Sequence, residues 1–143
     1  MKLKVSVLAF ALSISIAGIA SAHGLHAVGA DRGEKVVPNF SRPISNLPGK
    51  SLIAVEVSYA PGGSSPPHRH ANSAFIYGYV VSGSIVSQVE GEPARVYKAG
   101  ESFYEAPGAH HLAGGNASKT KPAKLLAVFV VDTDDKDLTV PDR

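Results

Sequence analysis

Apolar and polar residues alternate in short runs through the middle of the chain. Over residues 53–59, apolar side chains occupy every second position and polar or small residues lie between them. This period of two is typical of a strand that buries one face. The run 85–89 shows the same alternation, and 75–81 is rich in aromatic and β-branched residues, which favour strands. The nearly continuous apolar run 125–131 predicts the last core strand.

Glycine and proline separate these runs. The segment Pro61–Pro67 holds three prolines and predicts a loop that ends in an extended segment. Shorter strands are expected over 95–98 and 101–105, and a turn is expected at Gly114-Gly115-Asn116. Short strands at intervals of about 8 to 12 residues, without a helical period after residue 22, indicate an all-β sandwich or barrel.

The beginning of the chain has a different pattern. Lys2 and Lys4 precede an apolar run over 5–19, and Ala20-Ser21-Ala22 follows it. This order predicts a secretory signal peptide over residues 1–22 and a periplasmic or secreted protein that leaves the membrane after cleavage. An uncleaved anchor is the alternative, although the run is shorter than the roughly 20 apolar residues of a membrane span.

The rest of the chain divides into three parts. Residues 23–49 show no sustained period and are expected to form an irregular N-terminal arm. Residues 50–131 contain the predicted strands and form the folded domain, and 132–143 form an acidic and polar C-terminal tail. The 121 residues that follow the signal peptide suit a single domain with its own core.

Charge and cysteine content exclude several functions. Removal of Lys2 and Lys4 leaves 12 basic residues against 12 acidic ones, so the mature chain is neutral and no nucleic-acid partner is expected. The chain has no cysteine, which excludes a thiol nucleophile, a zinc-thiolate site and an iron-sulfur cluster. Stability must therefore come from packing, to which a metal ion could add.

Histidines form two tight groups, each just after a proline-containing turn. His68 and His70 are two residues apart on an extended segment, so both side chains leave the same face and a cation can bridge them. His110 and His111 are adjacent and point to opposite faces, so at most one of them completes the same site. Imidazole nitrogens suit zinc, copper, iron and nickel. The alternative is that these are ordinary surface or loop histidines.

Around these histidines the sequence resembles the cupin superfamily in two motifs. The first motif is Gly62 or Gly63, then Pro66-Pro67-His68-Arg69-His70, and later Gly83; the second is Gly100-Glu101, Pro107-Gly108 and His111. The resemblance spans roughly residues 50–131 and implies a single jelly-roll barrel, a double-stranded β-helix, with a metal inside its mouth. In that family the second motif supplies a histidine three residues after its glycine. The resemblance therefore implies His68, His70 and His111 as ligands.

The sequence departs from the family pattern in three places. Residues 71–75, where the family's glutamate ligand would fall, contain no carboxylate, and Ala106 stands where the second motif has a proline. The spacing from His70 to Gly83 is about two residues longer than usual, which predicts a bulge at Tyr77-Gly78-Tyr79.

The missing glutamate leaves two possible ligand sets. One is a three-histidine site with open positions. The other takes its fourth ligand from Glu105, six residues before His111 on the adjoining predicted strand, which would give the mixed histidine and carboxylate set of non-haem iron enzymes. The alternative for Glu105 is a salt-bridged surface residue.

Aromatic residues flank the histidines on the predicted strands, and some of them should line the barrel interior, either as ordinary core or as the wall of a small-molecule pocket. The residues assigned to this pocket are Tyr59, Phe75, Tyr77, Tyr79 and Tyr104, with Phe103 also placed near the histidines.

These features predict a cupin that binds a divalent transition metal: iron, manganese, zinc, nickel or copper. We expect a non-haem metal-dependent oxygenase acting on a small organic molecule. The alternatives are a non-enzymatic periplasmic protein that binds a small molecule or metal, and a structural β-sandwich that pairs through residues 75–81. A homodimer is expected because dimers are common for the fold.

Two minor motifs stand outside this prediction. His23 would become the N-terminal residue after cleavage and could bind copper, together with His26. The tripeptide Asn116-Ala117-Ser118 matches a glycosylation acceptor, but we interpret it as a turn.

Overall fold

A computed structural model describes residues 32–135 and 137–143 of the chain. The predicted signal peptide, His23 and His26 lie outside the described residues. Within the described part the regular elements are β-strands, and no helix there is long and apolar enough to cross a membrane. The strands are β1 (Glu34–Pro43), β2 (Lys50–Tyr59), β3 (Ser64–Ser65), β4 (His68–His70), β5 (Phe75–Ser82), β6 (Ser84–Val89), β7 (Arg95–Lys98), β8 (Ser102–Glu105), β9 (His110–Asn116), β10 (Ala123–Asp132) and β11 (Thr139–Pro141).

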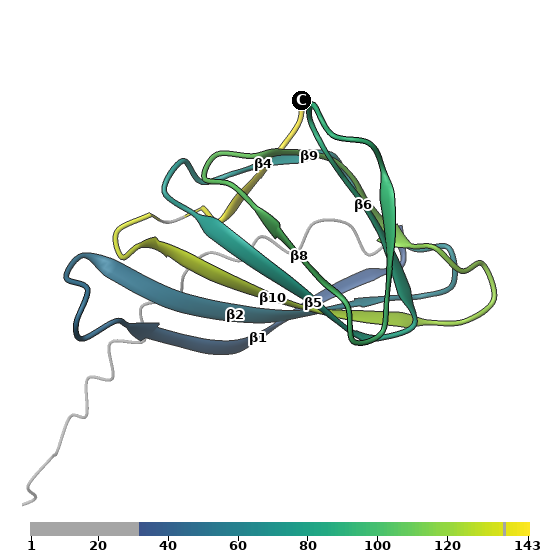
Figure 1. The fold of residues 1–143 in the computed structure, drawn as a ribbon, viewed down its shortest axis with the longest axis horizontal. Coiled ribbons are helices and arrows are strands. Elements are labelled where there is room, and N and C mark those ends of the chain that lie inside the picture. Colours follow the sequence, from purple (N-terminus) through teal and green to yellow (C-terminus); the bar gives the residue numbers. More distant parts are fainter. Residues whose placement is uncertain (1–31, 136) are drawn as a thin grey trace, which may run out of the picture.

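These strands form two antiparallel sheets that face each other. One sheet has the order β1-β2-β10-β5-β8, and the other has the order β11-β4-β9-β6-β7 with β3 paired to β9. In Figure 1, β1, β2 and β10 form the lower layer, and β4, β9 and β6 close over it. Neighbouring strands such as β2 and β10 are far apart in the sequence, as in a jelly roll. The predicted all-β barrel is confirmed.

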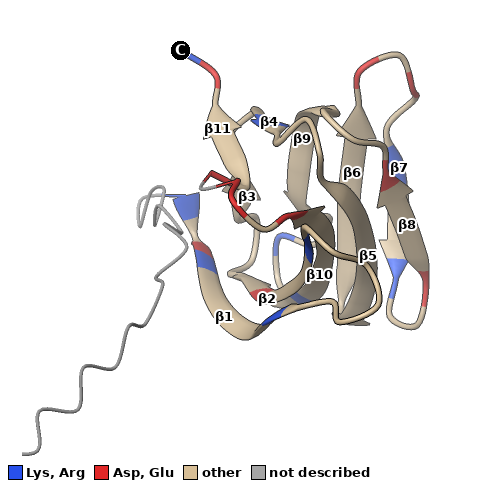
Figure 2. Ribbon diagram, turned by 90° about the vertical axis from the view of Figure 1, so that its left-hand side faces the viewer, with Lys and Arg blue, Asp and Glu red and all other residues tan. Residues whose placement is uncertain are grey.

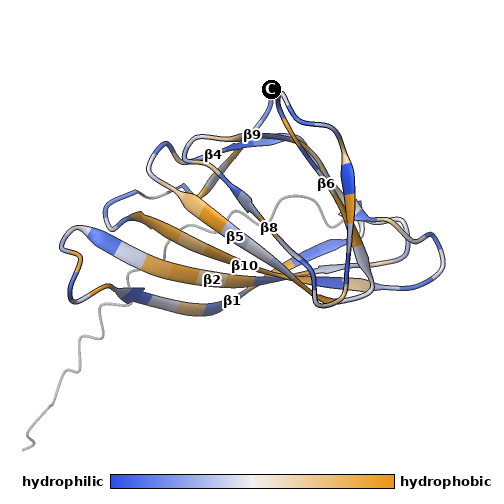
Figure 3. Ribbon diagram, in the orientation of Figure 1, coloured by the Kyte–Doolittle hydropathy of each residue, from blue (hydrophilic) through white to orange (hydrophobic). Residues whose placement is uncertain are grey.

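The core lies between the two sheets and follows the alternation seen in the sequence. On β2 and β10 every second residue is buried, and the apolar colour in Figure 3 is strongest on β2, β10 and β5. Val55 of β2 and Phe129 of β10 pack in this core together with Ile76 of β5 and Ile85 of β6. Burial of each such side chain contributes about 1.5 to 3 kcal/mol, so the core fixes which face of each strand points inward.

The predicted irregular arm is wrong over residues 34–43, which form β1 and pair with β2. Nearly every residue of β1 is exposed, so the strand carries no alternation of buried and exposed positions. Its prolines, Pro38 and Pro43, are tolerated because β1 is an edge strand with unpaired amides on one side. The sequence signals for a half-buried strand are therefore absent from this edge.

The predicted polar tail is also partly wrong. Residues 139–141 form β11 and pair with β4, and Leu138 is only 3% exposed. This pairing places the end of the chain directly beside the strand that carries His68 and His70. A single buried leucine after an aspartate-rich stretch gives too short an apolar pattern to predict a strand.

Two local predictions need correction as well. Tyr77, Gly78 and Tyr79 pair in regular register with β10. The irregularity in the pairing lies further along β5, between Val80 and Ser82. Gly114 and Gly115 do not form a turn but continue β9, where a Cβ on Gly115 would lie 2.7 Å from the backbone oxygen of Gly63. The glycines therefore permit close approach of two backbones.

Asn116 is buried at the end of β9, and its side chain organises the following turn. Its Nδ2 donates to the backbone oxygens of Ala60 (3.0 Å) and Lys121 (2.6 Å), and its Oδ1 accepts from the amide of Ser118 (2.8 Å). A buried, fully bonded amide is not available as a sugar acceptor. The tripeptide Asn116-Ala117-Ser118 therefore has a structural role, and the turn that it belongs to follows Asn116.

Charged residues are distributed over both sheets and the loops. Figure 2 shows basic and acidic residues interspersed, with acidic residues gathered in the loop after β10. Asp132, Asp134, Asp135 and Asp137 contribute to that loop region. Over the described residues this mixture of signs forms no basic stripe.

Candidate metal centre

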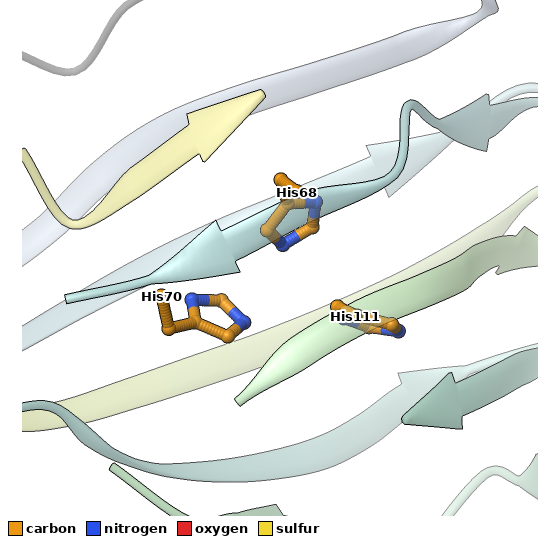
Figure 4. A group of neighbouring side chains, drawn as sticks. All are labelled: His68, His70 and His111. Carbon is orange, nitrogen blue, oxygen red and sulfur yellow. The ribbon is translucent and has the colours of Figure 1, made fainter. Parts of the chain in front are cut away.

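Three histidine side chains meet in the barrel interior. His68 and His70 lie on β4, and His111 lies on β9 directly opposite His68 in the register of the two strands. Each residue offers a ring nitrogen, and these nitrogens all lie within 4.8 Å of one another. Figure 4 shows the rings grouped between the two strands. The alternation of a strand places His68 and His70 on one face, and the register adds His111 to it.

Backbone carbonyls fix the rings of His68 and His70. Nδ1 of His68 lies 2.9 Å from the oxygen of Pro66, and Nδ1 of His70 lies 3.3 Å from the oxygen of Leu138. A carbonyl oxygen only accepts, so each Nδ1 carries the proton and each Nε2 keeps a free lone pair. This is how metal-binding histidines are commonly held. The carbonyl of Leu138 comes from the segment that the sequence had suggested was a polar tail.

Glu105 enters the same group from the opposite sheet. It ends β8, is only 4% exposed, and lies with Oε2 3.0 Å from Nε2 of His70 and Oε1 3.3 Å from Nδ1 of His111. The interpretation of Glu105 as a surface residue is therefore wrong. The carboxylate that the first motif lacks is present in space, supplied by a different strand.

Two buried atoms in this group have no hydrogen-bond partner: Nε2 of His70 and Oε2 of Glu105. The pair is close, at 3.0 Å, yet it is not aligned for a hydrogen bond. With the proton of His70 on Nδ1, neither atom has a hydrogen to donate to the other. Leaving a buried polar atom unpaired costs about 1 to 3 kcal/mol, and such atoms are rare in folded proteins. A cation between the two atoms would satisfy both.

The protonation of the group also suits a cation. Burial lowers the pKa of His68 to about 4 and lowers the pKa of His111, so both rings are neutral at neutral pH. Burial works to raise the pKa of Glu105, but its close contacts with the rings of His70 and His111 outweigh it and hold that pKa below its ordinary value. Neutral imidazoles around one carboxylate form a donor set for a divalent transition metal.

Ser87 holds the ring of His111 from β6. Its Oγ lies 3.2 Å from Nε2 of His111 inside the barrel. A Cβ added to Gly114, the register partner of Ser87, would lie 3.2 Å from the same nitrogen. Ser87 fixes the orientation of His111, and only glycine at position 114 leaves the ring unhindered.

His110 points to the outer face of β9, as the opposite directions of adjacent strand residues require. Its Nε2 lies 2.8 Å from Oδ2 of Asp142, and its Nδ1 lies 3.0 Å from Arg69 and 3.4 Å from Glu90. These contacts join the end of the chain to β4 and β9. Of the two adjacent histidines, it is His111 that faces the interior.

A cavity of about 120 Å³ adjoins the histidines between the sheets. Most of its wall is apolar, with Val55, Ile76, Phe103 and Phe129 among the lining residues. Of the aromatic residues assigned to the pocket, Tyr59 lines this cavity. The cavity is smaller than the roughly 150 Å³ space that holds benzene in an engineered protein core, so only a small organic molecule fits.

The other four aromatic residues assigned to the pocket do not line it. Phe75, Tyr77, Tyr79 and Tyr104 are between 37% and 68% exposed and lie on the outer face, where Phe75 stacks on Tyr104 with ring centroids 5.8 Å apart. On β5 the alternate residues Ile76 and Gly78 point inward instead. The sequence showed aromatic residues on one face of this strand and small or aliphatic ones on the other, and core packing selected the second face.

Four contributors to the site were missed in the sequence. Ser65 and Ser87 are ordinary serines in β3 and β6, and Leu138 contributes only its backbone oxygen to His70. Glu34 lines the cavity from β1, the strand that was not predicted. None of them carries a local sequence signal, because each acts through a contact with a distant strand.

Comparison with solved structures supports the fold. Oxalate oxidase in complex with glycolate shares 27% identity, with a TM-score of 0.58 over 78% of this chain. The chain spans only 56% of the length of that protein. KdgF from Halomonas sp. shares 24% identity, with a TM-score of 0.57 over 75% of this chain and 86% of its own. DMSP lyase DddQ from Ruegeria pomeroyi shares 24% identity, with a TM-score of 0.52 over 63% of this chain and 42% of its own.

Sequence comparison gives a family but no individual relative. No curated protein sequence matches the chain. The family profile of the cupin domain matches residues 55–129, just over half of the chain, and this range contains the three histidines and Glu105. Since the match coincides with the two facing sheets and the interior histidine group, the chain belongs to the cupin domain family.

Proposed function

We propose that this protein binds one divalent transition metal ion through His68, His70, His111 and Glu105. The observation that supports this most directly is the buried pair of lone-pair atoms, Nε2 of His70 and Oε2 of Glu105, which lie 3.0 Å apart without a hydrogen bond. A proton would have to be shared along a poor angle, whereas a cation accepts both lone pairs at once. Iron, manganese, zinc, nickel and copper all accept this donor set.

We further propose a non-haem metal-dependent oxygenase that acts on a small organic molecule. A redox-active ion such as iron(II), bound by three imidazoles and a carboxylate, would supply a reaction centre with open coordination positions. The chain's own residues would hold the ligand rings in place and form the wall of the cavity. Ser87 and the carbonyls of Pro66 and Leu138 hold the histidine rings, and a mostly apolar wall that includes Phe129 lines the cavity.

The likeness to oxalate oxidase supports a small, oxygen-bearing substrate. That structure contains glycolate, and its identity to this chain is 27%. Because the chain spans only 56% of that protein, its activity is not transferred with the fold. The cavity of about 120 Å³ is consistent with molecules of a few heavy atoms.

Metal analysis followed by oxygen uptake tests this function. The mature protein, purified without added chelator, should contain close to one metal ion per chain, and a His68→Ala/His70→Ala double variant should contain none. The iron-loaded protein should consume oxygen with a subset of small hydroxy acids, phenols or diketones. A protein that takes up no metal overturns the proposal. Metal uptake without oxygen consumption would leave the non-enzymatic binding protein as the function.

We also propose that the protein acts outside the cytoplasm. The support is the pattern of residues 1–22, in which Lys2 and Lys4 precede an apolar run and a small-residue cleavage site. N-terminal sequencing of the protein recovered from the periplasm or medium should begin at His23. Recovery of an intact N-terminus in the cytoplasm would contradict export.

A further inference from the structure

Glu34, Ser65 and Tyr59 form a second polar group on the wall of the same cavity, called here the Glu34 cluster. Glu34 lies directly opposite Tyr59 in the register of β1 and β2, so both side chains leave the same face. Oη of Tyr59 lies 2.6 Å from Oγ of Ser65, and Oγ of Ser65 donates a hydrogen bond to Oε1 of Glu34. Tyr59 is buried, and the group joins three separate strands.

The Glu34 cluster lies close to the metal centre. A Cβ placed on Gly114 would be 3.8 Å from Oγ of Ser65 and 3.2 Å from Nε2 of His111. Both groups therefore approach the same point, and glycine leaves no side chain between them. The cavity wall thus carries two polar groups, the histidine group and the Glu34 cluster, and apolar residues such as Val57 and Leu125 line other parts of it.

The direction of the hydrogen bonds decides what the cluster offers to a ligand. Ser65 has one hydroxyl hydrogen and gives it to Glu34, so Tyr59 must donate its own hydrogen to Ser65. Both donors are then used within the cluster. The carboxylate of Glu34 has about four lone-pair positions and uses one of them with Ser65. What remains toward the cavity is acceptor capacity, which requires a donor on the ligand.

The charges around the cavity point the same way. No lysine or arginine is found among the described residues that line it. Burial raises the pKa of Glu34 above its ordinary value, against the effects of Ser65, Tyr59 and, least of all, the exposed Arg32. A ligand carboxylate placed there would meet a like charge or force uptake of a proton, and either outcome weakens binding.

We propose that the Glu34 cluster binds the far end of the substrate and selects a hydroxyl or ammonium group there against a carboxylate. This inference rests on the proposed function, because the metal ion would bind the near end. The substrate class is then a short molecule with a metal-binding oxygen group at one end and a hydrogen-bond donor at the other. A dicarboxylate such as oxalate is disfavoured, although the fold is shared with oxalate oxidase.

Four acids that differ only at the far end test this selection: 3-hydroxypropanoate, β-alanine, butanoate and succinate. Each acid is titrated at pH 7 into the zinc-loaded mature protein, which begins at His23. Binding is followed by calorimetry, and the metal content of every sample is measured. The hydroxy and amino acids should bind about tenfold more tightly than butanoate, and succinate no more tightly than butanoate.

Variants at position 34 should change this order without changing metal content. Glu34→Ala should bind 3-hydroxypropanoate and β-alanine no more tightly than butanoate. Glu34→Gln should reduce the ratio of the affinities for β-alanine and succinate by about tenfold. Glu56→Gln is the matched control, because Glu56 lies on the opposite face of β2, paired with Lys124 at 2.8 Å. It should bind all four acids as the unaltered protein does.

Each other result has a definite meaning. Equal binding of the four acids by metal-loaded protein, or tighter binding of succinate, overturns the role of the Glu34 cluster and leaves the metal centre intact. That role is likewise overturned if Glu34→Ala and Glu56→Gln bind the four acids alike. A protein without metal overturns the proposed function and this inference together.

Discussion

His70 and Glu105 face each other inside the barrel, with Nε2 of the imidazole 3.0 Å from Oε2 of the carboxylate and no hydrogen bond between them. They come from different sheets, β4 and β8, which the core holds in place. This contact between two unpaired buried atoms destabilises the metal-free fold, whereas a bound cation would make it stabilising. Metal affinity, stability and their pH dependence should all reflect this pair and the residues around it.

Glu105→Gln should have opposite effects on the metal-free and metal-bound protein. After a small rotation of the side chain the amide can donate to Nε2 of His70, which removes the unpaired contact, so the metal-free variant should be more stable by about 1 to 3 kcal/mol. Loss of the negative charge should at the same time weaken metal binding more than tenfold. Chemical denaturation and metal titration of the same samples measure both effects. A variant that is less stable without metal would contradict the assigned proton on Nδ1 of His70.

His111→Ala and His110→Ala should differ sharply in metal affinity. His111 faces the metal centre, whereas His110 lies on the outer face with Asp142, so only the first variant should lose tight binding, by more than about 100-fold. His110→Ala should mainly loosen the end of the chain. Competition with a chromogenic chelator gives both affinities. Equal losses in the two variants would show that the wrong member of the pair has been assigned.

Gly114→Ala should weaken metal binding although it changes none of the proposed ligand residues. The new methyl group would lie 3.2 Å from Nε2 of His111 and would push the ring from its position against Ser87. Gly114 does not have a positive φ, so the backbone accepts alanine without strain. We expect a loss of metal affinity of about tenfold to 100-fold with an unchanged far-ultraviolet spectrum. Unchanged metal affinity would mean that the ring has room to move without cost.

The metal-free protein should lose stability as the pH falls from about 6.5 to 4. His68 has a pKa of about 4 in the folded protein and 6.5 as its ordinary value, so the unfolded chain takes up the proton first in this window. The lowered pKa of His111 acts in the same direction, and that of Glu105 adds to it below its ordinary value of 4.5.

Urea denaturation of the metal-free protein at pH 7 and pH 4.5 measures this dependence. For His68 the full effect is up to about 3 kcal/mol. The variant His68→Gln should show a shallower decline, because it lacks that titrating ring. Equal or greater stability at pH 4.5 in the unaltered protein would contradict the neutral state of the buried histidines.

Metal binding should raise the unfolding temperature of the protein, and a chelator should reverse the rise. A ligand present at about 100 times its Kd stabilises the folded state by about 2.7 kcal/mol. Differential scanning fluorimetry with and without zinc measures this change. The Glu105→Gln and His111→Ala variants should show a much smaller shift, whereas His110→Ala should retain it. A metal-dependent shift that is the same in all of these variants would place the ion elsewhere.

The sequence by itself determined the fold class and the histidine group. Alternation over 53–59 and 85–89 matches β2 and β6 because these strands bury one face, and a residue's side of a strand depends only on its position along the chain. The same local rule placed His68 and His70 on one face and separated His110 from His111. The resemblance to the cupin motifs then indicated His111 as the third member, which the structure places beside the other two.

Only the tertiary structure decided which contacts form between distant strands. β1 was not recognisable because an exposed edge strand with prolines lacks the alternation that burial produces, and with it Glu34 was missed. Phe75, Tyr77, Tyr79 and Tyr104 were assigned to the wrong face because alternation gives two faces but not their direction. The direction is set by the facing sheet, whose packing against Ile76 and Gly78 buries that side of β5 and leaves the aromatic side in water.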